Sequence, residues 1–215
     1  MTLANIQKGL AILVGAFVFY TAATGPFEGL IQRALFLALV ASLGFALYPL
    51  GAGTRWRPVG LAIDLALCTL VLIAGGYVVW NYDEIMTSLP WATALDKALT
   101  AGLVLAVLEL GRRTVGLIFP ILVVVGLSYA LFGDMLPGAL RHRGFDTAFV
   151  TETIYLGDLG IWGMLTGVAA TVIAAFVLFG ALLLHSGGGQ AFMDLAMRLG
   201  GRQPGGAAKI ATIAS

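Results

Sequence analysis

The chain of 215 residues is 60% hydrophobic and 11% charged, with a net charge of +1 and a mean hydropathy of +0.97. A soluble domain of this length does not bury so much apolar surface, so the composition excludes an ordinary soluble protein and indicates an integral membrane protein. The sequence has no long basic or acidic block. It therefore excludes nucleic acid as a partner and offers no polybasic segment that would recruit the protein to anionic lipid.

The apolar residues come in runs of about 17 to 25, which is the length of a membrane-spanning helix and not of a barrel strand. We therefore predict an all-α, polytopic transmembrane protein with about six membrane spans. Glycine, proline and polar residues separate the runs, as expected of the loops between spans. The predicted spans cover residues 6–23, 32–50, 59–82, 94–110, 115–132 and 161–184, and a further span begins at 210–215.

Residues 145–156 are too polar to cross a bilayer and alternate apolar and polar side chains at near-helical spacing. This pattern predicts an amphipathic helix at the outer membrane interface. We expect Phe145, Phe149 and Ile154 to face lipid. We expect Glu152 to face water.

The basic loops fall on one side of the predicted spans, and the acidic loop at Asp83 and Glu84 falls on the other. The positive-inside rule puts the basic side in the cytoplasm and therefore predicts a cytoplasmic N-terminus. The first run also has some features of a signal peptide, but its positive region is one residue deep and more spans follow, so an uncleaved helix is the simpler interpretation. The basic residues on the predicted cytoplasmic side are Arg55, Arg57, Arg112, Arg113, Arg198, Arg202 and Lys209.

Two carboxylates, Asp64 and Glu109, lie within or against predicted spans, where ionisable residues are functional candidates by default. Both fall near the cytoplasmic ends of their helices. Glu109 lies one helical turn before Arg113, and Asp64 is within reach of Arg112 or Arg113 across a helix interface. We expect structural ion pairs at these positions, with a proton relay as the alternative.

The sequence lacks the patterns of an enzyme or a nucleotide-binding protein. Its histidines, His142 and His185, are far apart, and it contains no HExxH motif. Two glycines have P-loop spacing, but Gly206 and Ala207 stand where Lys and Ser or Thr are needed. We therefore predict no catalytic residue, no cofactor site and no metal site. The tryptophans fall at span ends and are interpreted as interface anchors: Trp56, Trp80, Trp91 and Trp162.

Five short motifs follow one another in a fixed order between about residue 100 and residue 215. They are Leu108-Glu109-Leu110-Gly111-Arg112-Arg113, Leu136-Pro137-Gly138 with His142-Arg143-Gly144, Phe179-Gly180-Ala181-Leu182, Ser186-Gly187 and Gly205-Gly206-Ala207-Ala208-Lys209-Ile210-Ala211. Their order resembles the fused membrane component of a TRAP transporter. More narrowly, the chain resembles the fusions associated with TAXI-type binding proteins, in which a small four-helix subunit precedes the large transport subunit. Residues 1–100 match only in span count and topology.

The resemblance implies three parts. Residues 1–114 correspond to a small-subunit-like membrane domain, 115–133 to a connecting transmembrane helix and 134–215 to the start of a large transport-subunit-like domain. In the family, substrate and coupling ion are held at re-entrant hairpins beyond the segment that matches Ala207 to Ser215. The substrate- and ion-binding residues are therefore unknown and expected beyond Ser215, which we expect not to be the natural C-terminus.

The resemblance also implies a function. TRAP transporters of the bacterial inner membrane import organic anions, typically carboxylates and among them C4-dicarboxylates. They use a sodium or proton gradient and a periplasmic substrate-binding protein. The expected partners are that binding protein, the rest of the transport subunit and membrane lipid. The alternative is a stand-alone membrane scaffold or accessory subunit that binds no substrate.

Overall fold

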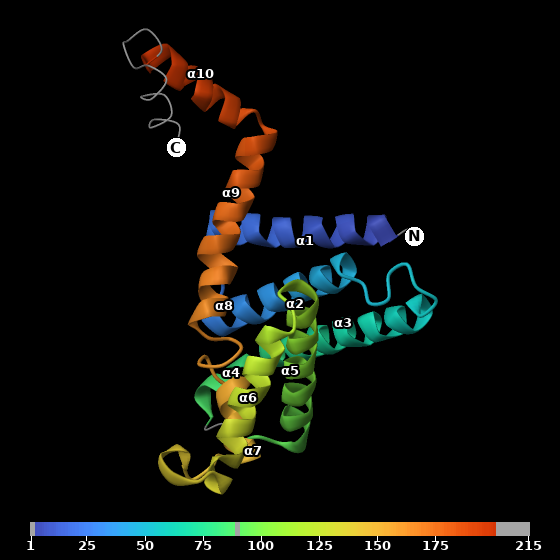
Figure 1. Ribbon diagram of the computed structural model, residues 1–215. Coiled ribbons are helices and arrows are strands. Elements are labelled where there is room, and N and C mark those ends of the chain that lie inside the picture. The colour runs from blue at the N-terminus through green and yellow to red at the C-terminus, as the bar shows by residue number, and fades with distance from the viewer. Residues whose placement is uncertain (1–2, 89–90, 201–215) are drawn as a thin grey trace. The chain divides into compact units, whose positions relative to one another are not determined.

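The computed structural model describes residues 3–88 and 91–200, which form helices and no strand (Figure 1). Residues 201–215, with the predicted further span and with Arg202 and Lys209, lie outside the described residues. The elements are α1 (Leu3–Thr24), α2 (Gly29–Leu47), α3 (Arg57–Trp80), α4 (Tyr82–Thr87), α5 (Ala94–Thr114), α6 (Ile118–Phe132), η1 (Gly133–Met135), η2 (Gly138–Leu140), α7 (Thr147–Ile154), α8 (Met164–Val168), η3 (Ala169–Ile173), α9 (Ala174–His185) and α10 (Gly188–Gly200).

Within the described part of the chain, five helical segments are long and apolar enough to cross a membrane. The all-α, polytopic architecture predicted from composition is therefore confirmed, whereas the count of six spans stays a prediction. Helix α5, at 21 residues, has the length of a span but is less apolar. The five segments are Ala4–Thr24, Gly29–Leu47, Arg57–Trp80, Ile118–Met135 and Met164–His185. The charged residues of α5 are Asp96, Lys97, Glu109, Arg112 and Arg113.

The chain divides into two compact units, Met1–Thr171 and Val172–Ser215. The core of the first unit lies where α2, α3 and α5 meet, and Figure 1 shows α2 beside α3 with α5 crossing them. Small residues let α2 and α3 approach closely. A Cβ added to Gly75 would lie only 3.2 Å from the Ala38 Cβ and 3.2 Å from the Ala34 carbonyl oxygen.

The segment that follows α7 closes this core with two aromatic residues, Tyr155 and Trp162, which are both fully buried. The Tyr155 hydroxyl donates to the Ala74 carbonyl of α3 at 2.8 Å, and the Trp162 Nε1 donates to the Tyr155 carbonyl at 2.8 Å. Burial raises the pKa of Tyr155, so the hydroxyl stays protonated and remains a donor.

The prediction that Trp162 anchors the membrane interface is therefore wrong. The indole is 1% exposed, because the chain turns back into the core after α7 and the Tyr155 carbonyl satisfies its N–H. The other three tryptophans, Trp56, Trp80 and Trp91, are exposed, as interface anchors need to be.

The predicted interfacial helix is shorter than expected and packs against protein. Asp146 caps the start of α7 by accepting from the Phe149 amide at 2.7 Å, and the helix contacts α5. Glu152 does not simply face water, since its Oε1 accepts from the Ala92 amide just before α5 at 3.2 Å. Phe145 and Phe149 stack with ring centroids 4.9 Å apart and remain exposed. An amphipathic pattern does not distinguish an interface with lipid from one with protein.

In the second unit, α9 ends at a tight turn before α10. Gly187 adopts φ +77, the left-handed conformation that commonly ends a helix and that glycine adopts without strain. Helix α10 is amphipathic, because Gln190, Asp194 and Arg198 recur at four-residue spacing on one side of it.

Replacing Trp162 with alanine tests whether the indole belongs to the core. We expect Trp162→Ala to lower the free energy of unfolding by about 3–5 kcal/mol, because it removes a fully buried aromatic side chain. The exposed Trp80 is the matched control, and Trp80→Ala is expected to change it by less than about 0.5 kcal/mol. Denaturant unfolding of the purified protein in detergent measures both. Equal effects of the two substitutions would contradict the burial of Trp162.

Candidate functional site

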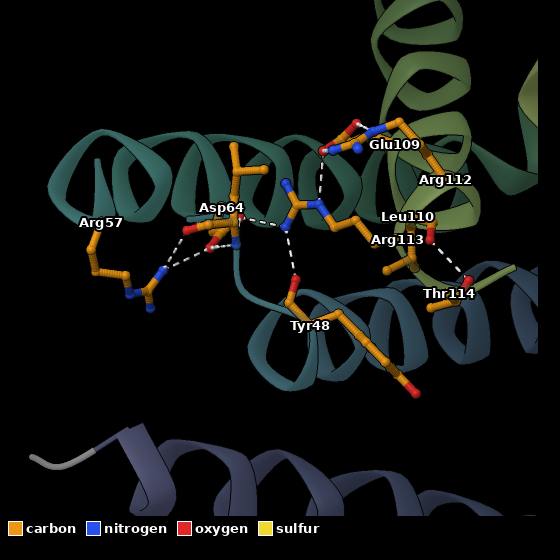
Figure 2. A network of polar contacts seen from close by, with 9 residues as sticks. Tyr48, Arg57, Asp64, Glu109, Leu110, Arg112, Arg113 and Thr114 are labelled. Carbon is orange, nitrogen blue, oxygen red and sulfur yellow. Dashed lines mark hydrogen bonds and ion pairs between the residues drawn. The ribbon is translucent and has the colours of Figure 1, made fainter. Parts of the chain in front are cut away.

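A network of charged side chains joins α3 to the last turn of α5 (Figure 2). The Asp64 Oδ1 accepts from the Arg113 Nη1 at 2.6 Å, and its Oδ2 accepts from the Arg57 Nη1 at 3.3 Å. The side chains of the first pair are nearly out of reach of solvent, at 8% exposed for Asp64 and 6% for Arg113. Buried charges of opposite sign that contact each other directly are strongly coupled, so the loss of one leaves the other unpaired.

Arg113 is the centre of the network. Its Nε donates to the Glu109 Oε1 at 2.7 Å, and its Nη1 also donates to the Tyr48 carbonyl at the end of α2 at 3.1 Å. The guanidinium lies 5.3 Å from the centre of the Phe45 ring, close enough for a cation–π contact. One side chain thus contacts α2, α3 and α5 together, as Figure 2 shows.

The four ion-pair residues that the sequence points to are brought together, although not in every combination. Asp64 pairs with Arg113 and not with Arg112. Arg112 instead makes a two-point contact with Glu109, in which its Nε and Nη2 each donate at 2.8 Å. This outer pair is more exposed, since 41% of the Arg112 side chain is accessible to solvent.

Sequence reasoning missed the contribution of the turn between α2 and α3. The Leu50 amide donates to the Asp64 Oδ2 at 3.1 Å, and the Leu50 carbonyl accepts from Arg57 at 3.2 Å. Gly60 allows this approach, because an added Cβ would lie within van der Waals overlap of the Leu50 carbonyl. The available signal was the spacing of Arg57 and Asp64, which are two turns apart on one face of α3.

A second polar assembly lies at the opposite end of α2. The Gln32 side chain is 1% exposed, and its Nε2 donates to the Ala170 carbonyl at 3.1 Å. The Arg33 Nη1 donates to the Trp162 carbonyl at 2.6 Å. We call these two side chains with their two carbonyl partners the α2 clasp. Its only indication in the sequence is weak, namely two polar residues at the start of a predicted span.

The α2 clasp holds a stretch of irregular helix. Ala170 lies in the π-helical segment Ala169–Ile173, an uncommon geometry that interrupts the regular bonding of an α-helix. The packing at this point is tight, because a Cβ added to Gly167 would lie 2.9 Å from the Arg33 Nε.

A family model described as "Tripartite ATP-independent periplasmic transporter, DctM component" matches residues 103–215, more than half of the chain. The chain belongs to this family. Neither the search of curated proteins nor the search of solved structures gives a match. The expectation of a TRAP permease drawn from the short motifs is therefore confirmed at the level of the family.

The DctM match begins inside α5, and both polar assemblies cross that boundary. In the charged network, Arg113 belongs to the matched region, whereas Asp64 precedes it. In the α2 clasp, the carbonyls of Trp162 and Ala170 belong to the matched region, whereas the side chains that bind them precede it. The residues before the match and residues within it therefore share polar contacts as well as a core.

Removing the charge of Asp64 tests how much the fold depends on the network. We expect Asp64→Asn to lower the free energy of unfolding by about 3–5 kcal/mol, because it leaves the buried Arg113 without its closest counter-charge. Arg112→Gln is the control and is expected to cost about 0–1 kcal/mol, as for an exposed ion pair. Unfolding in detergent and the yield of inserted protein measure the effect. If the Asp64→Asn variant is as stable as the parent protein, this expectation is wrong.

Proposed function

We propose that this chain supplies the scaffold-like helices and the first transport-domain helices of a TRAP-type secondary transporter. The transporter imports organic anions, most simply carboxylates, with a periplasmic binding protein and a sodium or proton gradient. The N-terminus lies in the cytoplasm of a bacterial cell, and the protein crosses the inner membrane. Within this proposal, the residues that bind solute and coupling ion belong to re-entrant hairpins of the transport subunit.

The observation that carries this proposal is the insertion of Tyr155 and Trp162 into the core made by α2, α3 and α5. Both aromatic residues belong to the region that matches DctM, whereas α2 and α3 precede it. A fused permease needs such an arrangement, because the part that moves solute must be supported by a part that stays fixed in the bilayer. The α2 clasp supports the same interpretation, since it fastens the start of the segment Met164–His185 to α2.

Within this proposal the charged network has a structural role. Both carboxylates are held by arginines at 2.6–2.8 Å, so they act as fixed partners of those cations. A proton relay at Asp64 is the competing interpretation. The two differ in one observable: under the structural role, Asp64→Asn lowers the amount of folded protein and leaves the dependence of uptake on the coupling ion unchanged.

Transport by the full-length protein tests the proposed function. The protein is reconstituted in liposomes, the periplasmic binding protein is added outside, and a panel of radiolabelled mono- and dicarboxylates is offered with an inward sodium or proton gradient. We expect uptake of at least one carboxylate that requires both the binding protein and the gradient. Uptake without the binding protein would contradict the proposed mechanism.

The alternative, a scaffold subunit that binds no substrate, predicts a different result in the same experiment. No solute of the panel would enter under any gradient, and the chain would instead raise the membrane yield of a separately encoded transport subunit. That pair of results would replace the permease proposal with the scaffold proposal.

The α2 clasp can be tested separately through Gln32. We expect Gln32→Leu to cost about 1–3 kcal/mol of stability, because the buried carbonyl of Ala170 loses its partner. Gln190 of α10 is exposed, so Gln190→Leu serves as the control for the same change of side chain. Thermal unfolding in detergent compares the two variants. If both variants unfold like the parent protein, the clasp does not fasten the segment that carries Ala170 to α2.

A further inference from the structure

A cavity of about 270 Å³ lies where the end of α3, the short helix α4 and the start of α5 meet. No residue of the charged network or of the α2 clasp lines it. The lining is rich in side-chain oxygen atoms. The described residues that form it are Tyr77, Asn81, Glu84, Ile85, Ser88, Trp91, Thr93, Asp96 and Leu156.

Asp96 gives this cavity an unusual electrostatic character. Its side chain is 3% exposed, and its Oδ2 is occupied by the Thr93 amide at 2.9 Å and the Thr93 hydroxyl at 2.6 Å, in a capping box at the start of α5. The Oδ1 is buried and has no hydrogen-bond partner among the described residues. The Tyr77 hydroxyl lies close to Asp96. A buried carboxylate oxygen without a partner is costly, so it is a place where a ligand is favoured.

The cavity offers further oxygen ligands and no compensating charge. Glu84 is a second carboxylate, Ser88 has a hydroxyl, and Asn81 has an amide oxygen in addition to the Nδ2 that donates to the Tyr77 carbonyl at 2.9 Å. Of the described residues that line the cavity, none is Lys, Arg or His. Asp96 and Glu84 also form no ion pair within the described part of the chain.

We propose that this cavity binds a hard divalent cation of the calcium type, with Asp96 and Glu84 as its charged ligands and Asn81, Ser88 and water as neutral ones. Two carboxylates balance two positive charges, and oxygen is the donor that such cations take. The bound ion would tie the end of α3 and α4 to the start of α5. This inference is independent of solute transport.

The composition of the site separates calcium from other metals. Zinc and copper favour nitrogen and sulfur ligands, and the described residues that line the cavity include no His and no Cys. Magnesium demands a near-ideal octahedron, whereas calcium accepts six to eight oxygens in flexible arrangements and tolerates several waters. With only two carboxylates we expect a dissociation constant of about 10⁻⁴ to 10⁻³ M, typical of extracellular calcium modules.

Terbium luminescence tests the site directly, because Tyr77 and Trp91 line the cavity and can transfer excitation to a Tb³⁺ ion bound there. The full-length protein in a non-ionic detergent, freed of metal by dialysis against a chelator, is titrated with Tb³⁺ while its aromatic residues are excited. The variants are Asp96→Asn and Glu84→Gln. Asp83→Asn is the matched control, since Asp83 is the neighbouring carboxylate but does not line the cavity.

We expect the affinity for Tb³⁺ to fall on the order of tenfold or more in Asp96→Asn and Glu84→Gln, and to be unchanged in Asp83→Asn. Calcium at roughly millimolar concentration should displace Tb³⁺ and should raise the unfolding temperature of the parent protein and of Asp83→Asn, but not of Glu84→Gln. Glu84 lies outside the capping box, so Glu84→Gln keeps the test valid even where Asp96→Asn fails to fold.

Two results would overturn the proposal. The first is equal Tb³⁺ emission and affinity in all four proteins, which would show adventitious binding to surface carboxylates only. The second is displacement of Tb³⁺ by sodium chloride as effective as by calcium chloride at equal ionic strength, which would show charge screening and not a site.

Discussion

The contact between Asp64 and Arg113 sets the positions of the helices that the rest of the first unit depends on. Arg113 reaches the end of α2 through the Tyr48 carbonyl, α3 through Asp64 and its own helix through Glu109. An ion pair this deeply buried gains little net free energy over an apolar pair, because both charges lose their hydration. We infer that its contribution is to specificity: only one register of α3 against α5 pairs these charges.

The α2 clasp fixes the position of the other end of α2. There the polar groups are neutral or singly charged donors, and their partners are the carbonyls of Trp162 and Ala170. Between the two assemblies, the contact of α2 with α3 is apolar and close-packed, through small residues such as Ala34, Ala38 and Gly75. In hydrocarbon, apolar packing alone specifies register weakly, because lipid is as apolar as the side chains. Polar contacts at both ends of α2 supply the missing specificity.

The positions of the helices were predictable from sequence, and their contacts mostly were not. Long apolar runs bounded by Gly and Pro define spans within a few residues, because a bilayer forces each run into one helix. Pairing of Glu109 with Arg113 follows from four-residue spacing alone. Other features depend on residues that are distant in sequence: the burial of Trp162, the contact of Glu152 with the Ala92 amide and the cavity at Asp96. No local pattern distinguishes an aromatic residue at a span end that meets lipid from one that turns into the core.

The π-helical segment Ala169–Ile173 lies where the α2 clasp binds the chain. It spans the boundary between the two compact units, and its carbonyl at Ala170 is the one that Gln32 binds. A π turn leaves the regular i→i−4 ladder, so in a membrane its backbone groups need a partner from protein. Gln32 provides one. The last residues of the first unit are thereby fixed to α2.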